Sequence, residues 1–222
     1  MAPDALIANL EQKKGALSAR CIEAMYRDPF WQARFGDRGR RHAEQDSAYH
    51  VQYVIAALRE GEVNVFCNYA VWLRGVLCSR GMCSHHLAES FRKLVRALAE
   101  EGVADAEPAA AVLLRGVESL RYGTGAAAEL EQQETTLEGQ LRAELASEPY
   151  RFTELASFLK DALARGDGQG WAQHLTFLRE HLAVSEAERA ELDATVSALA
   201  PAALSLLSPD AARLAASLIK AD

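Results

Sequence analysis

Three residues with acid–base or metal-binding chemistry recur at helical spacing in the first half of the chain. His42, Asp46 and His50 stand four residues apart, so a helix places them in one stripe along its surface. A carboxylate that contacts an imidazole fixes its tautomer and raises its basicity, as general bases and the surroundings of metal ligands require. The stripe continues into Val54 and Leu58, which indicates that Asp46 and His50 border a buried face. A histidine satisfied within the core, or a solvated helix start, is the structural alternative.

Four arginines lie directly before this stripe, among glycines and aromatic residues. They are Arg34, Arg38, Arg40 and Arg41, beside Gly36, Gly39, Phe30, Trp31 and Phe35. Guanidinium groups bind carboxylate or phosphate bidentately, and the N-terminus of a following helix adds free backbone donors. The segment therefore predicts an anion-binding loop. The alternative is a surface loop whose arginines pair with Asp28, Asp37 and Glu44.

A second group of possible metal ligands follows further along the chain. His85 and Glu89 share a helix face, and with His42 and His50 from another helix they are the candidate ligands of iron or another transition metal. His85 and His86 lie off the apolar stripe of their own helix, which predicts that both are exposed to solvent. The spacing does not reproduce the signature of di-iron bundles. Zinc spacings, nucleotide-binding glycine motifs and nucleophile triads are not recognisable either.

Aromatic residues are concentrated beside the His42–His50 stripe. Tyr49, Tyr53, Tyr69 and Trp72 belong to two consecutive predicted helices, where an aromatic-lined cavity would hold a planar ligand. Core packing is the alternative explanation. A tetrapyrrole would fit these features, since it has a flat apolar body, carboxylates for the arginines and, as haem, an iron for His50.

Apolar residues recur every three or four positions throughout, which predicts an all-α protein, a bundle of about ten helices. Proline, glycine and capping residues mark the helix ends. The expected helices span residues 4–27, 42–60, 63–80, 84–102, 108–120, 126–147, 150–165 and 169–182, with a ninth from Ser185 and a tenth from Ser208. Residues 30–41 are expected to form a loop.

Four blocks of the first half recur in order in the second half. Leu10, Leu17 and Pro29 match residues 120 positions later, and Ala57, Gly61 and Trp72 match residues 105 positions later. Ser84 matches Ser185 at 101, and Pro108 matches Pro201 at 93. The pattern predicts two tandem pseudo-repeats, 1–125 and 126–222, packed together as one body. The distance in sequence between matched residues falls from 120 to 105 after Pro29, so the first repeat contains residues that the second lacks. They form an additional basic and histidine-bearing segment, 31–50. Shared helical composition is the alternative.

Composition narrows the class of protein. The 222 residues are 50% hydrophobic and 25% charged, the usual globular balance. A formal net charge of −7 disfavours nucleic acid and anionic membranes as partners. The four cysteines form no C-x-x-C pair, and no apolar run has the length of a spanning helix, so a cytoplasmic protein is expected.

Three functions remain open on the sequence. The first is a helical sensor or carrier that binds a small molecule or cofactor in the first repeat, with Arg38, Arg40 or Arg41 on its anionic group; this function involves no catalysis. The second is a metal-dependent, iron-type helical-bundle enzyme that uses Asp46 and His50. The third is a protein–protein interaction scaffold, in which helix 126–147 docks a regulatory partner or a second copy in a homodimer.

Overall fold

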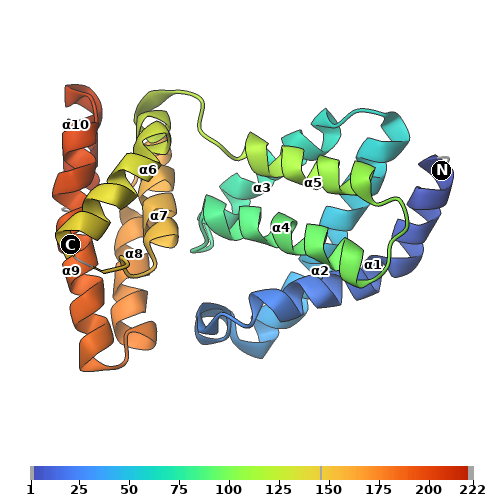
Figure 1. Cartoon of the computed structure of the whole chain (residues 1–222), viewed down its shortest axis with the longest axis horizontal. Coiled ribbons are helices and arrows are strands. Elements are labelled where there is room, and N and C mark those ends of the chain that lie inside the picture. The colour runs from blue at the N-terminus through green and yellow to red at the C-terminus, as the bar shows by residue number, and fades with distance from the viewer. Residues whose placement is uncertain (1–2, 146, 220–222) are drawn as a thin grey trace. The chain divides into compact units, whose positions relative to one another are not determined.

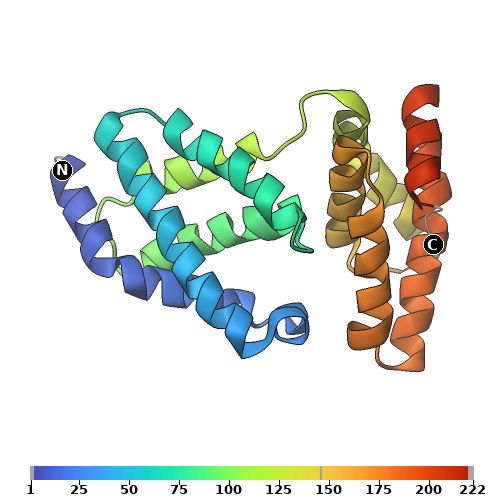
Figure 2. The same cartoon turned by 180° about the vertical axis from the view of Figure 1, so that it is seen from behind.

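The computed structural model describes residues 3–145 and 147–219, and helices make up 84% of these residues. Figures 1 and 2 show their arrangement. Ten α-helices and no strand occur among the described residues, which confirms the all-α prediction. The helices are α1 (Pro3–Met25), α2 (Pro29–Glu60), α3 (Asn64–Cys78), α4 (Ser84–Glu100), α5 (Glu107–Ser119), α6 (Gly125–Leu145), α7 (Phe152–Arg165), α8 (Gln169–Phe177), α9 (Glu186–Leu206) and α10 (Pro209–Ile219). Ala146, within the predicted helix 126–147, lies outside the described residues.

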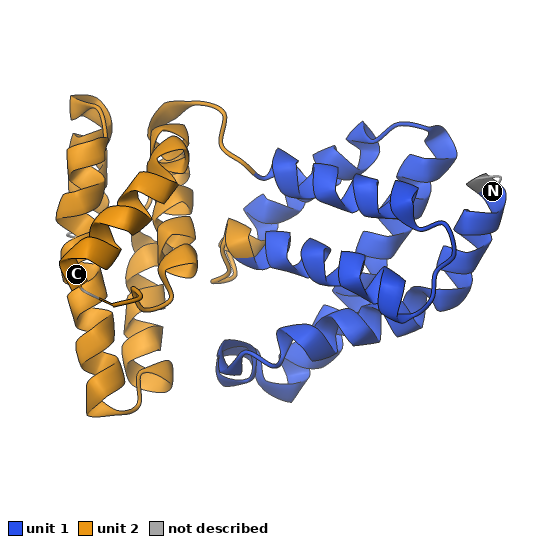
Figure 3. Ribbon diagram, viewed as in Figure 1, with its two compact units in different colours: residues 1–76, 86–120 blue, residues 77–85, 121–222 orange. Residues whose placement is uncertain are grey.

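The chain divides into two compact units (Figure 3). Unit 1 comprises residues 1–76 and 86–120, and unit 2 comprises residues 77–85 and 121–222. The short segment 77–85, which contains the end of α3, the connection and the start of α4, therefore belongs to the second unit. None of the described helices combines the length and apolarity that crossing a lipid bilayer requires.

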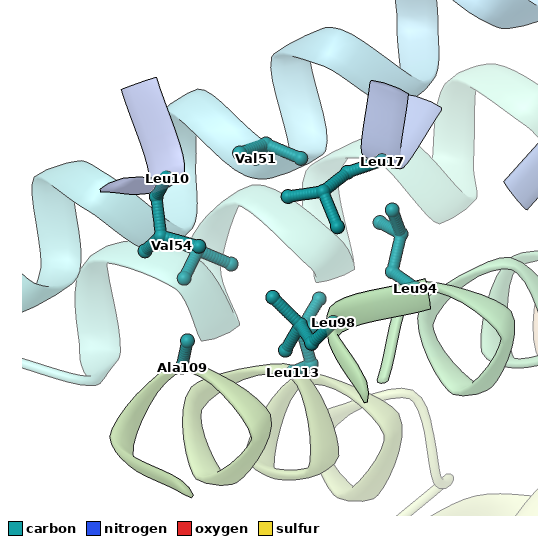
Figure 4. Close-up of a pocket in the computed structure, with 8 residues that line it drawn as sticks. All are labelled: Leu10, Leu17, Val51, Val54, Leu94, Leu98, Ala109 and Leu113. Carbon is teal, nitrogen blue, oxygen red and sulfur yellow. The ribbon is translucent and has the colours of Figure 1, made fainter. Parts of the chain in front are cut away.

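Unit 1 is built around α2, which packs against α1 and α5. Its core contains an apolar cavity of about 10 Å³ (Figure 4). The lining residues are Leu10, Leu17, Val51, Val54, Leu94, Leu98, Ala109 and Leu113. A space of this size is about that of one water molecule, so it is a packing gap between helices rather than a ligand pocket.

The predicted loop over residues 30–41 is wrong, because α2 already begins at Pro29. The Asp28 carboxylate caps this helix by accepting a hydrogen bond from the Phe30 N–H at 2.9 Å, and proline suits the first helical position. Gly36, with φ 56° and ψ −164°, interrupts the helix with a kink. Glycine tolerates this left-handed φ without the steric cost of a side chain, so the chain turns there and resumes as a helix.

Unit 2 is built around α7, which contacts α6, α8 and α10. Every residue of α7 from Glu154 to Leu163 is buried. The thin apolar stripe of α6, formed by Leu130, Leu137 and Leu141, is fully buried as well. This stripe is therefore already used for packing inside the unit and is not an open docking face.

Local signals at the helix ends of unit 2 are mostly confirmed. Ser185 and Glu188 form the predicted capping box at the start of α9. The predicted helix 169–182 is α8 followed by a π-helical turn, Leu178–Leu182. Pro201, matched in sequence to Pro108, lies inside α9 instead of beginning a helix.

Candidate functional site

A buried histidine and a buried tyrosine form the base of the candidate site in unit 1. His50 of α2 is 5% exposed, and its Nδ1 lies 2.7 Å from the hydroxyl oxygen of Tyr69 in α3. The ring of Phe91 meets the imidazole edge-on at 5.2 Å between centroids. Burial lowers the pKa of His50 to about 3, so the ring is neutral at neutral pH. His50 therefore holds Tyr69 in place from within the core.

Three exposed aromatic side chains belong to the same two helices as this base, and we call Tyr49, Tyr53 and Trp72 the aromatic surface. Their exposed fractions are 54%, 38% and 62%. Tyr53 stacks on Tyr69 with ring centroids 3.8 Å apart and planes 11° apart, and Tyr69 lies 6.2 Å from Trp72. Tyr49 precedes Tyr53 by one helical turn. Tyr53 and Trp72 thus present their rings to solvent while packing against the buried ring of Tyr69.

Asp46 adds a negative charge to the same region. It is exposed on α2, one turn before Tyr49 and His50. Burial, followed by the charge of Asp46, raises the pKa of Tyr69. The carboxylate is therefore close enough for its field to reach the tyrosine hydroxyl. The predicted stripe exists, but Asp46 faces solvent while His50 is enclosed.

The arginines predicted to bind an anion lie far along α2 from His50. Arg40 is 3.9 Å from Glu44 and places its guanidinium 5.2 Å from the centre of the Tyr26 ring, while Arg38 and Arg41 are exposed. The helix is already formed at these positions, so the free backbone donors expected at His42 are not there. The rise of 1.5 Å per residue separates Arg38 from His50 by about 18 Å along the helix.

The candidate metal ligands are distributed over different environments. His42 is exposed, whereas the backbone N–H of His85 donates to Ser157 Oγ at 2.9 Å. The Glu89 carboxylate pairs with Arg92 and Lys93 at 3.1 and 2.9 Å. Within residues 3–145 and 147–219, no group of three or more His, Cys, Asp or Glu side chains is arranged to hold a metal ion.

His86 is buried, so the prediction that it is exposed is wrong. Its ring lies 4.6 Å from Phe30 and 5.1 Å from Trp31, measured between centroids, and only 5% of the residue is accessible. The kink at Gly36 turns the start of α2, and the Tyr26 hydroxyl donates to the Gly36 carbonyl at 3.3 Å. Phe30 and Trp31 thus pack into the unit, and they cover His86.

Unit 2 contains buried polar residues outside the predicted site. Lys160 donates to Glu131 at 2.8 Å and to Glu134 at 2.6 Å, and His174 Nε2 lies 3.3 Å from Glu154 Oε1. Asp161 accepts from the Ser84 N–H at 2.7 Å. Helical periodicity assigns such residues to a solvated face, and only the cover provided by other elements buries them. Their mutual pairing is typical of structural polar networks.

No model of a protein family matches this chain, and neither a curated protein nor a solved structure does. The residues and contacts of the two units are therefore the basis for proposing a function.

Proposed function

We propose that this protein is a non-catalytic binding protein, and that a partner protein docks on the aromatic surface of unit 1. The observation that carries the proposal is the exposure of Tyr49, Tyr53 and Trp72, of which Tyr53 and Trp72 pack against the buried Tyr69. Tyrosine and tryptophan are enriched among the residues that dominate the energy of protein interfaces. Three of them on adjacent helix faces make a larger apolar patch than isolated surface residues do.

The environment of His50 supports binding over catalysis. A general base needs access to a substrate proton and a pKa near the working pH. His50 is enclosed by Tyr69 and Phe91, and burial lowers its pKa to about 3. We therefore assign His50 the role of positioning the Tyr69 ring that supports Tyr53.

The open shape of the site favours a partner protein over a small molecule. Pockets for small ligands enclose most of the ligand surface, whereas the aromatic surface lies on the outer faces of α2 and α3. Arg38, Arg40 and Arg41 lie about 14 to 18 Å along α2 from His50, so a small acidic ligand held by them would not also contact the imidazole. A protein surface spans such distances readily.

We also infer that the two units are tandem pseudo-repeats. Gly61 and Gly166, matched at an offset of 105, end α2 and α7 with φ of 67° and 63°, and their N–H groups donate to the matched residues Ala57 and Ala162.

At the same offset, the Tyr53–Tyr69 stack corresponds to Phe158 and His174. Their rings stack 3.8 Å apart with an angle of 13°, against 3.8 Å and 11° in unit 1. The recurrence of one ring geometry at matched positions supports a shared ancestral unit.

The repeat relationship strengthens the argument for an open binding face. Tyr53 and Trp72 correspond to Phe158 and Phe177, which are 3% and 5% exposed. In unit 1 the same face carries larger aromatic groups and stays accessible, as expected for a surface that a second molecule covers.

Two matched double variants of the full chain test the proposal. Tyr49→Ala with Trp72→Ala removes the aromatic surface, and Leu114→Ala with Val184→Ala removes two other exposed apolar side chains, 45% and 64% accessible. A protein captured by the wild-type chain is purified and titrated calorimetrically against all three forms. We expect the first variant to weaken binding by about thirtyfold or more, and the second to change it little.

Equal affinity of the captured protein for all three forms would contradict the proposal. A small molecule that copurifies with the chain, with an absorption spectrum altered by His50→Ala, would instead favour a sensor or carrier. Stoichiometric iron or manganese that is lost in His50→Ala would favour the metal-dependent enzyme.

A further inference from the structure

Trp72, Tyr69 and His50 form a continuous series of contacts from the surface of unit 1 to its core. The Trp72 ring is 62% exposed and lies 6.2 Å from the Tyr69 ring, measured between centroids. Tyr69 is 7% exposed, and its hydroxyl oxygen lies 2.7 Å from Nδ1 of the buried His50. Tryptophan and tyrosine are the aromatic side chains that lose an electron most readily. The series therefore joins an oxidisable ring at the surface to an oxidisable ring and a base in the core.

The hydrogen bond between Tyr69 and His50 gives the phenolic proton a place to go. Burial raises the pKa of Tyr69 and lowers the pKa of His50 to about 3, so both groups are neutral in the resting protein. When the imidazole carries its proton on Nε2, Nδ1 accepts the hydrogen bond from the Tyr69 hydroxyl. A phenol that has lost an electron is a strong acid, so even a weakly basic imidazole within hydrogen-bond reach takes its proton.

A second tyrosine and tryptophan of unit 1 show what this arrangement adds. The rings of Tyr26 and Trp31 lie 6.3 Å apart with 34° between their planes, against 6.2 Å and 33° for Tyr69 and Trp72. Trp31 is only 8% exposed, however, and the Tyr26 hydroxyl donates to the Gly36 carbonyl at 3.3 Å. A carbonyl oxygen accepts a hydrogen bond but is too weak a base to hold the proton. The Tyr26 pair thus lacks both the exposed ring and the base.

We propose that Tyr69 and His50 form a redox-active pair, which takes up one oxidising equivalent that a radical oxidant delivers to Trp72. The oxidant removes one electron from the indole and is reduced to an anion, while the indole N–H proton passes to water. Tyr69 then returns an electron to the indole, which recovers its proton from water. The Tyr69 O–H bond breaks as an N–H bond forms at His50 Nδ1. The net change is one electron moved from Tyr69 to the oxidant and one proton moved from Tyr69 to His50.

The surroundings of the pair favour a reversible reaction. Burial, followed by the charge of Asp46, raises the pKa of Tyr69, so the negative field of Asp46 reaches the hydroxyl and stabilises the positive charge of the oxidised pair. Burial disfavours an imidazolium at His50, so the proton returns to Tyr69 when a one-electron reductant such as ascorbate restores the electron. Phe91 and Phe66 pack against the two rings, with centroids 5.2 Å from His50 and 5.9 Å from Tyr69. The pair works in the free chain and does not depend on the partner protein.

Pulse radiolysis of the full chain tests the reaction. Azide radicals, which oxidise tryptophan and tyrosine, are generated in a short pulse, and the absorption bands of the indolyl and phenoxyl radicals are followed. Trp31 and Trp171 are 8% and 2% exposed, so the first indolyl signal comes from Trp72. We expect this signal to decay as a phenoxyl signal grows, at a rate that does not depend on protein concentration. The transfer should be slower in D₂O, because a proton moves with the electron.

Three conservative variants locate the radical and the base, and circular dichroism verifies that each is folded. Tyr69→Phe keeps the ring without the hydroxyl, so the indolyl radical should outlive that of the wild type. His50→Gln keeps a hydrogen-bond acceptor but provides no base, and the transfer should slow by about a hundredfold. Tyr26→Phe is the matched control, because the Tyr26 ring lies against a tryptophan in the same geometry. It should leave the transfer rate unchanged.

Equal transfer rates in the wild type and His50→Gln, or in H₂O and D₂O, would show that His50 does not take the proton and would overturn the proposal. So would an indolyl signal that decays without growth of a phenoxyl signal, or a transfer that is unaltered in Tyr69→Phe. The isotope effect is measured on the wild-type chain, so it does not require any variant to fold. The partner titrations described above involve no oxidation, so failure of the binding function leaves these outcomes unaffected.

Discussion

Gly116 of α5 lies directly against the ring of Phe66 in α3. A Cβ atom at Gly116 would stand 2.2 Å from Cε1 of that ring, and Phe66 is fully buried. The absence of a side chain at Gly116 thus sets how closely α5 approaches α3. Since Phe66 in turn packs against Tyr69 at 5.9 Å, this contact helps to position the helix that carries Trp72.

Gly116→Ala should destabilise the protein by about 1 to 3 kcal/mol, because the buried Phe66 ring has no room to move. Gly139→Ala is the control. Gly139 lies in α6 with nothing within 4 Å of an added Cβ, so its replacement should stabilise the helix by about 0.5 to 1 kcal/mol. Urea unfolding followed by circular dichroism measures both changes. A neutral Gly116→Ala would contradict the close contact.

Trp72→Ala and Phe177→Ala should differ strongly in their effect on stability. Trp72 is 62% exposed and Phe177 is 5% exposed. Truncation of the exposed ring should change the free energy of unfolding by about 0.5 kcal/mol or less, and truncation of the buried ring should cost about 3 to 5 kcal/mol. Chemical denaturation provides the comparison. Similar losses would show that Trp72 serves packing instead of binding.

His50 should make the protein sensitive to acid. Its pKa is lowered by burial from 6.5 to about 3, so the unfolded chain binds a proton below pH 6.5 while the folded chain does not. The stabilisation is complete above pH 6.5 and declines as the pH falls towards 3, by about 2 kcal/mol between pH 7 and pH 5.

His50→Gln, which keeps a polar partner for Tyr69, tests this dependence. The variant should lose less unfolding free energy than the wild type over the same pH interval, measured by urea titrations at both values. Parallel losses in the two proteins would mean that another group titrates.

Asp161→Ala should destabilise unit 2. The buried carboxylate accepts hydrogen bonds from the Ser84 N–H at 2.7 Å, from the Ser84 hydroxyl and from the Tyr122 hydroxyl at 2.5 Å. Its removal leaves buried donors without an acceptor, at a cost of about 2 to 4 kcal/mol. Asp193→Ala is the control, because Asp193 is 58% exposed in its pair with Arg179. Thermal unfolding should shift for the first variant only.

The four thiols should react with a disulfide reagent in a defined order. Burial raises the pKa of Cys21 to about 11, and Cys78 and Cys83 are buried as well. Cys67 is half-buried, so at about pH 8 it should react first, because the thiolate is the reactive form and needs access. Cys67→Ser should abolish the fast phase. A fast phase that persists in that variant would place the accessible thiol elsewhere.

Part of the candidate site follows from sequence alone. The spacing of Asp46, His50 and Tyr53 places them on neighbouring turns of a helix whatever surrounds it. The pairing of His50 with Tyr69 does not follow in this way, because it depends on how α3 lies against α2. The arginines were expected beside His50 because both belong to one segment, but a straight helix keeps residues that are nine to twelve positions apart well separated.

The helical class and many helix ends follow from local sequence signals, among them the glycine caps at Gly61 and Gly166 and the capping box at Ser185. These features depend on bonds between residues a few positions apart. Which polar and aromatic side chains are covered depends on the packing of the helices, as buried His86 and exposed Trp72 show. Burial is set by whichever helix packs alongside, and residues distant in the chain supply that helix.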